Sequence, residues 1–313
     1  MTTQHAGIVW NPTKTDRDEL EAAVRDAAGE ANPPEVSWFE TREDDPGRAA
    51  TKDALDAGAD LIVAAGGDGT VRAVAEHLAE TGAVAELGIV PRGTGNLLAR
   101  NLEIPLNDAA AALTRAFTGA ASPLDIGWAE VTTPTGVERK AFAVMAGFGI
   151  DAHMITETDD DLKDKAGWLA YVESLGRAVS ASAVIDLQLS VDGGDERPER
   201  AHTVILGNCG MLQGGLTLLP DADPRDGQLD LLVLHADGMA GWLDTLRTAA
   251  WDNGIKRVFS GGRAASGDST THRRLTELRV VLAEPREFEV DGDELGEITQ
   301  ARVWIQPGAV RVR

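Results

Sequence analysis

The segment LIVAAGGDGTVRAV, residues 61–74, restricts the fold more than any other stretch of the chain. Five apolar residues run into Gly66, Gly67 and Gly69, and apolar residues at helical spacing follow at once. This order predicts a buried strand, a tight turn and a helix capped by Thr70. Backbone N–H groups and the positive end of the helix dipole would then converge on one point above the sheet. The glycines therefore predict that a phosphate group approaches the main chain there.

The first third of the chain alternates apolar runs with amphipathic segments. Strands are expected at residues 5–10, 35–39, 60–65 and 86–90, and helices at residues 20–31, 47–58, 70–78 and 106–117. Strands that alternate with helices imply right-handed crossovers and a mainly parallel sheet. We therefore predict that residues 1–124 form a doubly wound α/β domain.

After about Ser122 the pattern changes to strands separated by turn residues. Strands are expected at residues 124–131, 140–150, 183–191, 201–208, 229–236, 275–283, 286–292 and 301–306. Helices are expected only at 168–179 and 241–251, and exposed connections at 157–165 and 192–200. This pattern predicts a second, largely antiparallel domain over residues 125–313, either a sandwich or a barrel.

Charge and cysteine content restrict the partners and the compartment. The formal net charge of −22 over 313 residues repels nucleic-acid phosphates, so no nucleic-acid partner is expected. Cys209 is the single cysteine, and no charged-then-apolar leader precedes Ile8. These features favour a cytoplasmic protein. The apolar runs are shorter than the roughly 20 residues of a membrane-spanning helix, so any membrane contact is expected to be peripheral.

A second glycine-rich turn follows the strand at 86–90, in IVPRGTGNLLAR, residues 89–100. Ligands of parallel sheets bind at the carboxyl ends of the strands. Two such turns, together with the residues after the first strand, therefore predict one shared phosphate site. Neither turn has the residue order of a P-loop or of a GxGxxG dinucleotide motif. The alternative is that each glycine serves only a tight structural turn.

Six segments in order resemble the bacterial diacylglycerol kinase family, which includes sphingosine kinase-like lipid kinases. They are NPTK (11–14), GGDGT (66–70), PRGTGN (91–96), LDIG (124–127), LPDADPRDGQLD (219–230) and VDGDEL (290–295). The resemblance covers nearly the whole chain. GGDGT also occurs in NAD kinases and phosphofructokinases, whereas the later segments favour a lipid kinase. The resemblance implies an ATP-dependent enzyme that phosphorylates a lipid hydroxyl, with its active site between an α/β domain and a β-sandwich.

The family's nucleotide contacts transfer to matching positions in this chain. The resemblance places ATP against Asn11, Pro12, Thr13, Thr41, Gly66, Gly67, Asp68, Gly69, Thr70, Gly93, Thr94, Gly95 and Asn96. Glycine and threonine are also ordinary turn and cap residues, which is the alternative for each of them. Since a carboxylate repels a phosphate, Asp68 is expected to bind Mg²⁺, directly or through water.

Phosphoryl transfer to an alcohol needs positioning, charge neutralisation and a base that accepts the hydroxyl proton. The family supplies this base as the glutamate of a DGE-type segment. Asp293 stands at the matching position with a side chain one methylene shorter, and Glu294 follows it. We expect Asp293 to be the base, because Glu294 points elsewhere if the segment is extended. A polar hairpin turn is the alternative.

The resemblance also implies a structural magnesium site. Its matching residues are Asp223, Asp226 and Gln228, while Asp125 resembles an acid of the network that connects this magnesium to the active site. An acidic turn without metal is the alternative. Leu97 stands where many relatives have an aspartate, which we interpret as a subfamily difference.

The expected partners are ATP and a membrane lipid, first of all diacylglycerol converted to phosphatidic acid. Sphingosine, ceramide or phosphatidylglycerol, a soluble substrate of the NAD kinase type, and a non-catalytic binding protein are the alternatives. The basic stretch 255–275, with Lys256, Arg257, Arg263, Arg273 and Arg274, is expected to dock on anionic membrane, unless it is ordinary surface charge. The oligomeric state stays open, a homodimer included.

Overall fold

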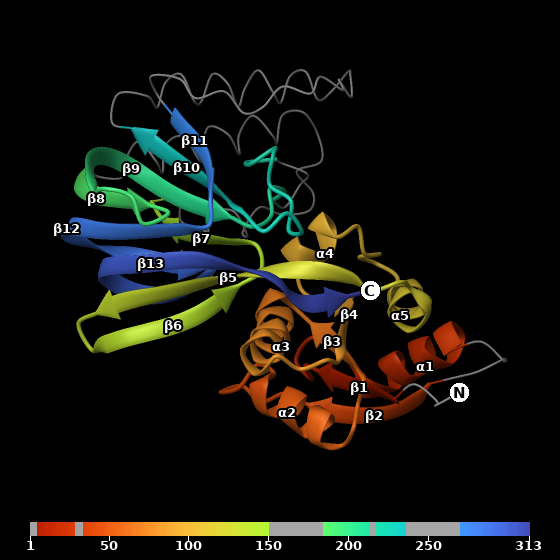
Figure 1. Cartoon of the computed structure of the whole chain (residues 1–313). Helices are drawn as coiled ribbons and strands as arrows, with labels where there is room; N and C mark the ends of the chain where they lie inside the picture. The colour runs from red at the N-terminus through yellow and green to blue at the C-terminus, as the bar shows by residue number, and fades with distance from the viewer. Residues whose placement is uncertain (1–4, 29–33, 150–183, 213–216, 236–269) are drawn as a thin grey trace, which may run out of the picture.

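The computed structural model describes residues 5–28, 34–149, 184–212, 217–235 and 270–313. Figure 1 shows helices gathered around one group of strands and a second group of strands extending away from them. The predicted combination of an α/β half and a β half is confirmed. Among the described helices, none has the length and apolar character needed to cross a membrane.

The N-terminal half is a parallel sheet covered by helices. Its strands are β1 (His5–Trp10), β2 (Glu35–Glu40), β3 (Leu61–Gly66) and β4 (Glu86–Pro91), in the spatial order β4-β3-β1-β2. Its helices are α1 (Arg17–Ala28), α2 (Arg48–Asp56), α3 (Asp68–Thr81), α4 (Leu97–Asn101) and α5 (Ala109–Thr118). Helix α1 packs beside α5, and α2 packs beside α3. This is the predicted doubly wound arrangement.

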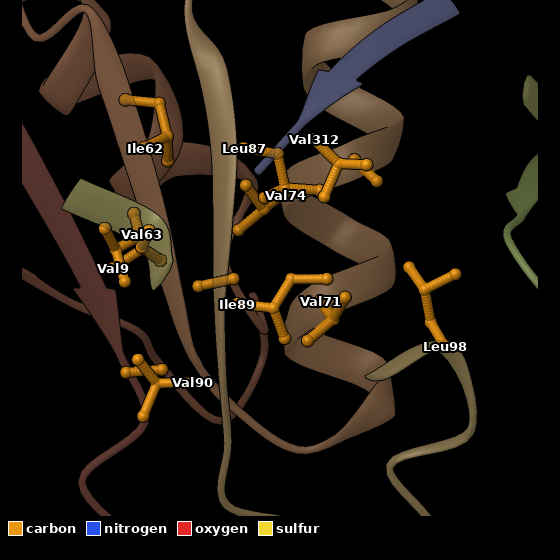
Figure 2. Close-up of a cluster of buried hydrophobic side chains, with 14 of the residues drawn as sticks. Val9, Ile62, Val63, Val71, Val74, Leu87, Ile89, Val90, Leu98 and Val312 are labelled. Atoms are coloured by element: carbon orange, nitrogen blue, oxygen red, sulfur yellow. The ribbon is translucent and has the colours of Figure 1, made fainter. Parts of the chain in front are cut away.

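The core of this half confirms that the segment starting at Leu61 is a buried strand. Every residue of β3 is buried, as expected for a strand covered on both faces. Figure 2 shows Val71 and Val74 of α3 beside Leu87 and Ile89 of β4. The apolar side chains after the glycines therefore anchor α3 to the sheet.

Helix α3 begins earlier than the sequence predicted. Gly67 is its N-cap residue, with an extended backbone and no side-chain capping bond. Thr70 is therefore the third helical residue and not the cap, and its N–H donates to the Gly67 carbonyl at 3.1 Å. The prediction was wrong because the glycines allow the chain to enter the helix immediately after the strand. The first turn of α3 is consequently free of a capping side chain.

The C-terminal half is antiparallel, as predicted. Its strands are β5 (Ser122–Thr133), β6 (Gly136–Phe142), β7 (Met145–Phe148), β8 (Ile185–Val191), β9 (Arg197–Gly207), β10 (Leu229–His235), β11 (Thr270–Leu275), β12 (Glu277–Val290) and β13 (Asp293–Val312). They pair with one another in antiparallel register and enclose a second hydrophobic core.

Several boundaries in this half differ from the prediction, among them β11, which was not expected, and β13, which extends far beyond the expected strand 301–306. The expected strand at 140–150 is interrupted at Ala143 and Val144, between β6 and β7. The two strands expected at 275–283 and 286–292 belong to the single strand β12, which carries irregular pairing in its middle. Strand β9 starts inside the expected connection 192–200. The expected helices 168–179 and 241–251 and the connection 157–165 lie outside the described residues.

Strand β13 joins the two halves. Most of its length pairs with β12 and β5, and near its end Val312 pairs with Leu87 of β4 in parallel. Among the described residues, thirteen strands are therefore connected by hydrogen bonds, ten of them along one path and β5, β6 and β8 beside it. Strand β13 thus connects the β half to the first residues of β4 at the edge of the parallel sheet (Figure 1).

Candidate active site

The predicted site segments meet at the carboxyl edge of the parallel sheet. Strands β1, β3 and β4 end in register, with Trp10 opposite Ala65 and Gly66 opposite Pro91. The segments that follow stay bonded to this edge. Asn11 N–H donates to the Ala65 carbonyl at 3.0 Å, Arg92 N–H to Gly66 at 2.8 Å and Thr41 N–H to Trp10 at 2.9 Å. The structure therefore brings these segments together.

The two glycine-rich turns lie directly against each other. A Cβ atom added to Gly93 would lie 2.7 Å from the Cα atom of Gly67, and one added to Gly95 would lie 2.8 Å from Asp68 Oδ2. Both distances are too short for a side chain. Close contact between the turns thus requires glycine before any ligand is considered. Gly69 differs, because a Cβ atom there would meet nothing within 4 Å.

The Asp68 side chain holds the two turns together. Its Oδ2 accepts the Asn96 N–H at 2.7 Å and its Oδ1 accepts the Leu97 N–H at 2.6 Å. Asn96 adopts the left-handed conformation, with φ of 48°, and its Oδ1 accepts the Gly93 N–H at 2.9 Å. Burial raises the pKa of Asp68 although these N–H groups stabilise its charge. Asp68 was predicted only as a magnesium ligand, and its structural link between the turns was not predicted.

The remaining predicted nucleotide residues lie around the same edge with different exposure. Asn11 Oδ1 accepts the backbone N–H of Thr13 at 2.9 Å and its hydroxyl at 2.8 Å, which forms a compact turn around exposed Pro12. Thr41 is buried, whereas Thr94 is exposed on the second turn. The turn at 11–13 and Thr94 thus offer polar groups to solvent at this edge.

A small cavity lies where the two halves meet. It is lined by Asp68, Val71, Arg72, Leu97, Leu98, Ala143, Val144 and Asp291. Residues from α3, α4, the break between β6 and β7 and the β12–β13 turn therefore share one wall. The cavity combines two carboxylates and one guanidinium with apolar side chains, and it has room for about one water molecule.

Asp291 organises the far side of this cavity. Its carboxylate accepts the backbone N–H groups of Ala143 at 2.7 Å, Val144 at 2.9 Å and Met145 at 2.9 Å. These bonds explain why the strand expected at 140–150 is interrupted, since the amides face Asp291 instead of a neighbouring strand. Burial raises the pKa of Asp291 to about 6 in spite of the three donors. No separate role was predicted for Asp291, which stands within the segment VDGDEL.

Asp293 lies at the rim of the site and contacts the first half of the molecule. It opens β13, and its carboxylate accepts a hydrogen bond from the Arg72 guanidinium. Arg72 is buried in α3, while the Asp293 side chain is 54% exposed. The predicted base is thus attached to the helix that begins at the first glycine-rich turn. Sequence reasoning did not identify Arg72, because its partner is 221 residues away.

The predicted structural magnesium residues form a well-bonded turn. Asp125 accepts the N–H groups of Gly227 at 2.7 Å and Gly308 at 2.6 Å. Asp226 Oδ1 accepts the Gln228 N–H at 3.0 Å, and its Oδ2 lies 3.4 Å from Arg274. Within the described residues, no three histidine, cysteine, aspartate or glutamate side chains cluster in a way that could hold a metal. The magnesium site that includes Asp223 stays a prediction.

Protonation of Asp291 should be visible in the stability of the protein. Its folded pKa of about 6 lies above the ordinary 3.8, so the folded state binds the proton more tightly. This contribution is complete below about pH 4 and is lost as the pH rises through 6. Between these values, the free energy of unfolding of the wild type should fall by up to about 3 kcal/mol relative to Asp291→Asn. Urea titrations at several pH values measure the difference, and a difference independent of pH would contradict the assignment.

Comparison with known proteins identifies the family. Residues 5–129 match the model of the diacylglycerol kinase catalytic domain, and residues 144–313 match the YegS C-terminal NAD kinase beta sandwich-like domain. The chain is 33% identical over 309 residues to a "Probable lipid kinase YegS-like" of Pseudomonas aeruginosa, covering 97% of this chain and 92% of that protein. The chain belongs to the YegS-like lipid kinase family. The resemblance stated from the sequence motifs is confirmed.

Two further relatives of this YegS-like lipid kinase extend the comparison. A protein of the same description from Stenotrophomonas maltophilia is 33% identical over 321 residues, covering 100% of this chain and 96% of the relative. A solved diacylglycerol kinase structure from Bacillus anthracis superposes with a TM-score of 0.69 at 22% identity, covering 99% of this chain and 96% of that one. The second likeness concerns the fold, and it confirms the predicted two-part architecture.

Proposed function

We propose that this member of the YegS-like lipid kinase family uses ATP to phosphorylate the hydroxyl group of a membrane lipid. Diacylglycerol is the first candidate substrate. The observation that carries the proposal is the pair of glycine-rich turns joined by Asp68. The two turns lie at the carboxyl edge of the sheet, beside the cavity between the halves. Family membership supports phosphoryl transfer, and the geometry supports the place where it would occur.

The open side of Gly69 is our proposed site for the ATP phosphates. Gly67 and Gly93 are packed against each other, so a ligand cannot enter between them. Gly69 and Thr70 belong to the first turn of α3, whose N-terminal end attracts anions through the helix dipole. Asn11, Thr13, Thr41 and Thr94 surround the same edge and would line the nucleotide.

The site fits Mg²⁺ bound together with a nucleotide. Magnesium in kinase sites is held by one or two carboxylates, substrate phosphates and water, and it needs no cage of protein ligands. Asp68 provides one such carboxylate on the cavity wall and would hold the ion directly or through water. When bound, the ion would neutralise charge on the transferred phosphoryl group. A second ion at Asp226 would compete with the nearby Arg274.

Asp293 is the proposed base. The lipid oxygen forms a bond to the γ-phosphorus, the bond from that phosphorus to the ADP oxygen breaks, and the hydroxyl proton passes to Asp293. The exposed carboxylate at the rim of the cavity can receive a substrate hydroxyl, and its contact with Arg72 holds it near α3. Asp291 is unsuited to this role because it accepts three backbone N–H groups.

Family membership supports a lipid acceptor over a soluble one, and the lining of the cavity between the halves is compatible with it. Leu97, Leu98, Ala143 and Val144 line it next to the carboxylates. A soluble acceptor of the NAD kinase type would need additional polar groups at these positions. Among lipids, the contacts leave sphingosine, ceramide and phosphatidylglycerol as alternatives to diacylglycerol.

A radiolabel transfer assay tests the function. The protein is incubated with [γ-³²P]ATP, Mg²⁺ and one acceptor at a time: diacylglycerol, sphingosine, ceramide, phosphatidylglycerol or NAD. We expect label in phosphatidic acid, and at least about 100-fold less of it with the Asp293→Asn variant. Label in another lipid would correct the substrate, while label in NAD alone or in no acceptor would overturn the proposal.

We further propose peripheral binding to anionic membrane through the basic stretch 255–275. Lys256, Arg257 and Arg263 lie outside the described residues. Arg274 lies on β11, where it contacts Asp226 and Asp230, so its charge is already compensated. Four other cations remain: Arg273, which is exposed on β11, and Lys256, Arg257 and Arg263, which are the ones to test.

Charge reversal should weaken this membrane binding. We expect the triple variant Lys256→Glu, Arg257→Glu, Arg263→Glu to lose most of its sedimentation with phosphatidylglycerol vesicles at low salt. The matched control is the triple variant Arg17→Glu, Arg42→Glu, Arg279→Glu. These three arginines are exposed, and their reversal changes the net charge by the same amount. Equal loss in both variants would mean that net charge alone matters and that the stretch is ordinary surface.

A further inference from the structure

Arg72 is a buried cation in an unusual place. It is the fifth residue of α3, one turn after Asp68, and its side chain is only 8% exposed. A guanidinium removed from water is costly unless carboxylates surround it. Arg72 lines the cavity, so its neighbours identify what this charge does.

Carboxylates from both halves surround the Arg72 guanidinium. Glu76, one turn further along α3, lies 3.5 Å from Nη1, and Nη2 donates to Asp293. Asp291 is close enough for the guanidinium to lower its pKa against the opposing effect of burial. Nε is buried and has no hydrogen-bond partner among the described residues. The guanidinium therefore connects α3 to the β12–β13 turn.

Without this contact, little would fix the Asp293 carboxylate. Its side chain is 54% exposed, and it follows Asp291 and Gly292, which both have positive φ angles of 49° and 87°. An exposed aspartate ordinarily samples several rotamers. The planar guanidinium presents donors in a rigid fork, which restricts a bound carboxylate to one orientation. Glu76 in turn restrains the guanidinium from the other side.

We propose that Arg72 is a positioning residue that holds Asp293 at a set distance from the phosphate site. The inference rests on the proposed function. Helix α3 begins at the first glycine-rich turn and carries Arg72 four residues later, which corresponds to a rise of about 6 Å. The same rigid helix thus fixes the phosphate end of the site and the residue that orients the base.

Steady-state kinetics of Arg72→Gln and Arg72→Lys test the inference. For Arg72→Gln, we expect kcat to fall about 10- to 100-fold and the KM for ATP to change less than threefold, because orientation matters in the transition state. Arg72→Lys keeps the charge but loses the fork, so its kcat should lie between those of Arg72→Gln and the wild type. Arg279→Gln, which removes an exposed paired arginine on β12, is the control and should match the wild type.

A double variant separates positioning from general structural support. If Arg72 acts through Asp293, adding Arg72→Gln to Asp293→Asn should cause less than a twofold further loss of kcat. A further loss of tenfold or more would overturn the inference, as would full kcat in Arg72→Gln. If Arg72→Gln does not fold, Arg72→Lys in the same cycle decides the question. A wild type with no transfer to any acceptor would instead overturn the proposed function and the inference together.

Discussion

Asp293→Asn is expected to lower kcat for lipid phosphorylation by about 10²- to 10⁴-fold, the usual contribution of a general base. Asparagine has nearly the size of aspartate and can still accept a hydrogen bond from Arg72, but it cannot take the hydroxyl proton. The KM for ATP should stay close to the wild-type value, because Asp293 lies on the β13 side of the site and the nucleotide residues belong to the other half. Initial rates with saturating ATP measure the effect.

Glu294→Gln is the matched control for this prediction. It neutralises the adjacent carboxylate, which the sequence offered as the alternative base. We expect this variant to keep kcat within about threefold of the wild type. If Glu294→Gln loses activity while Asp293→Asn keeps it, the assignment of the base is wrong and Glu294 takes its place.

Gly93→Ala is expected to abolish ATP binding and to destabilise the fold. The added methyl group would lie 2.7 Å from the Gly67 Cα atom, and neither main chain can move away without separating the turns. Separation would break the bonds from Asn96 and Leu97 to Asp68. We expect the free energy of unfolding to fall by about 1–3 kcal/mol, as for other overpacked sites. Urea denaturation and calorimetric ATP titration measure the two effects.

Gly69→Ala separates ligand binding from folding. Its methyl group would enter open space inside α3, where alanine is favoured over glycine by about 0.5–1 kcal/mol. Stability should therefore hold or rise, while ATP binding should weaken if phosphates occupy that space.

For Gly93→Ala, wild-type ATP affinity would contradict the prediction, because it would show that nucleotide binding does not depend on contact between the turns.

Local patterns were sufficient to predict the fold. The run from Leu61 through the glycines predicted a buried strand followed by a helix. A continuous apolar run and apolar residues at helical spacing stand next to each other in this short segment. The change to turn-separated strands after Ser122 predicted the antiparallel half for the same reason. Where the prediction was wrong, as at Ala143 and Val144, a distant side chain, Asp291, had taken the backbone N–H groups.

The candidate site was only partly predictable from the sequence. The glycines, Asp68 and Asp293 stand in motifs and could be found without a structure. Arg72 stands in no motif, since a lone arginine on a helix resembles any solvated charge. The proposed role of Arg72 depends on its contact with Asp293 in the other half of the molecule. Neither local propensity nor hydrophobic spacing predicts this contact.

The most direct test of the account is a crystal structure of the protein with a non-hydrolysable ATP analogue and Mg²⁺. The account predicts that the β- and γ-phosphates contact the main-chain N–H groups of the first turn of α3, on the open side of Gly69, with the ion next to Asp68. A nucleotide bound elsewhere, with this edge of the sheet covered by the protein's own side chains, would contradict it.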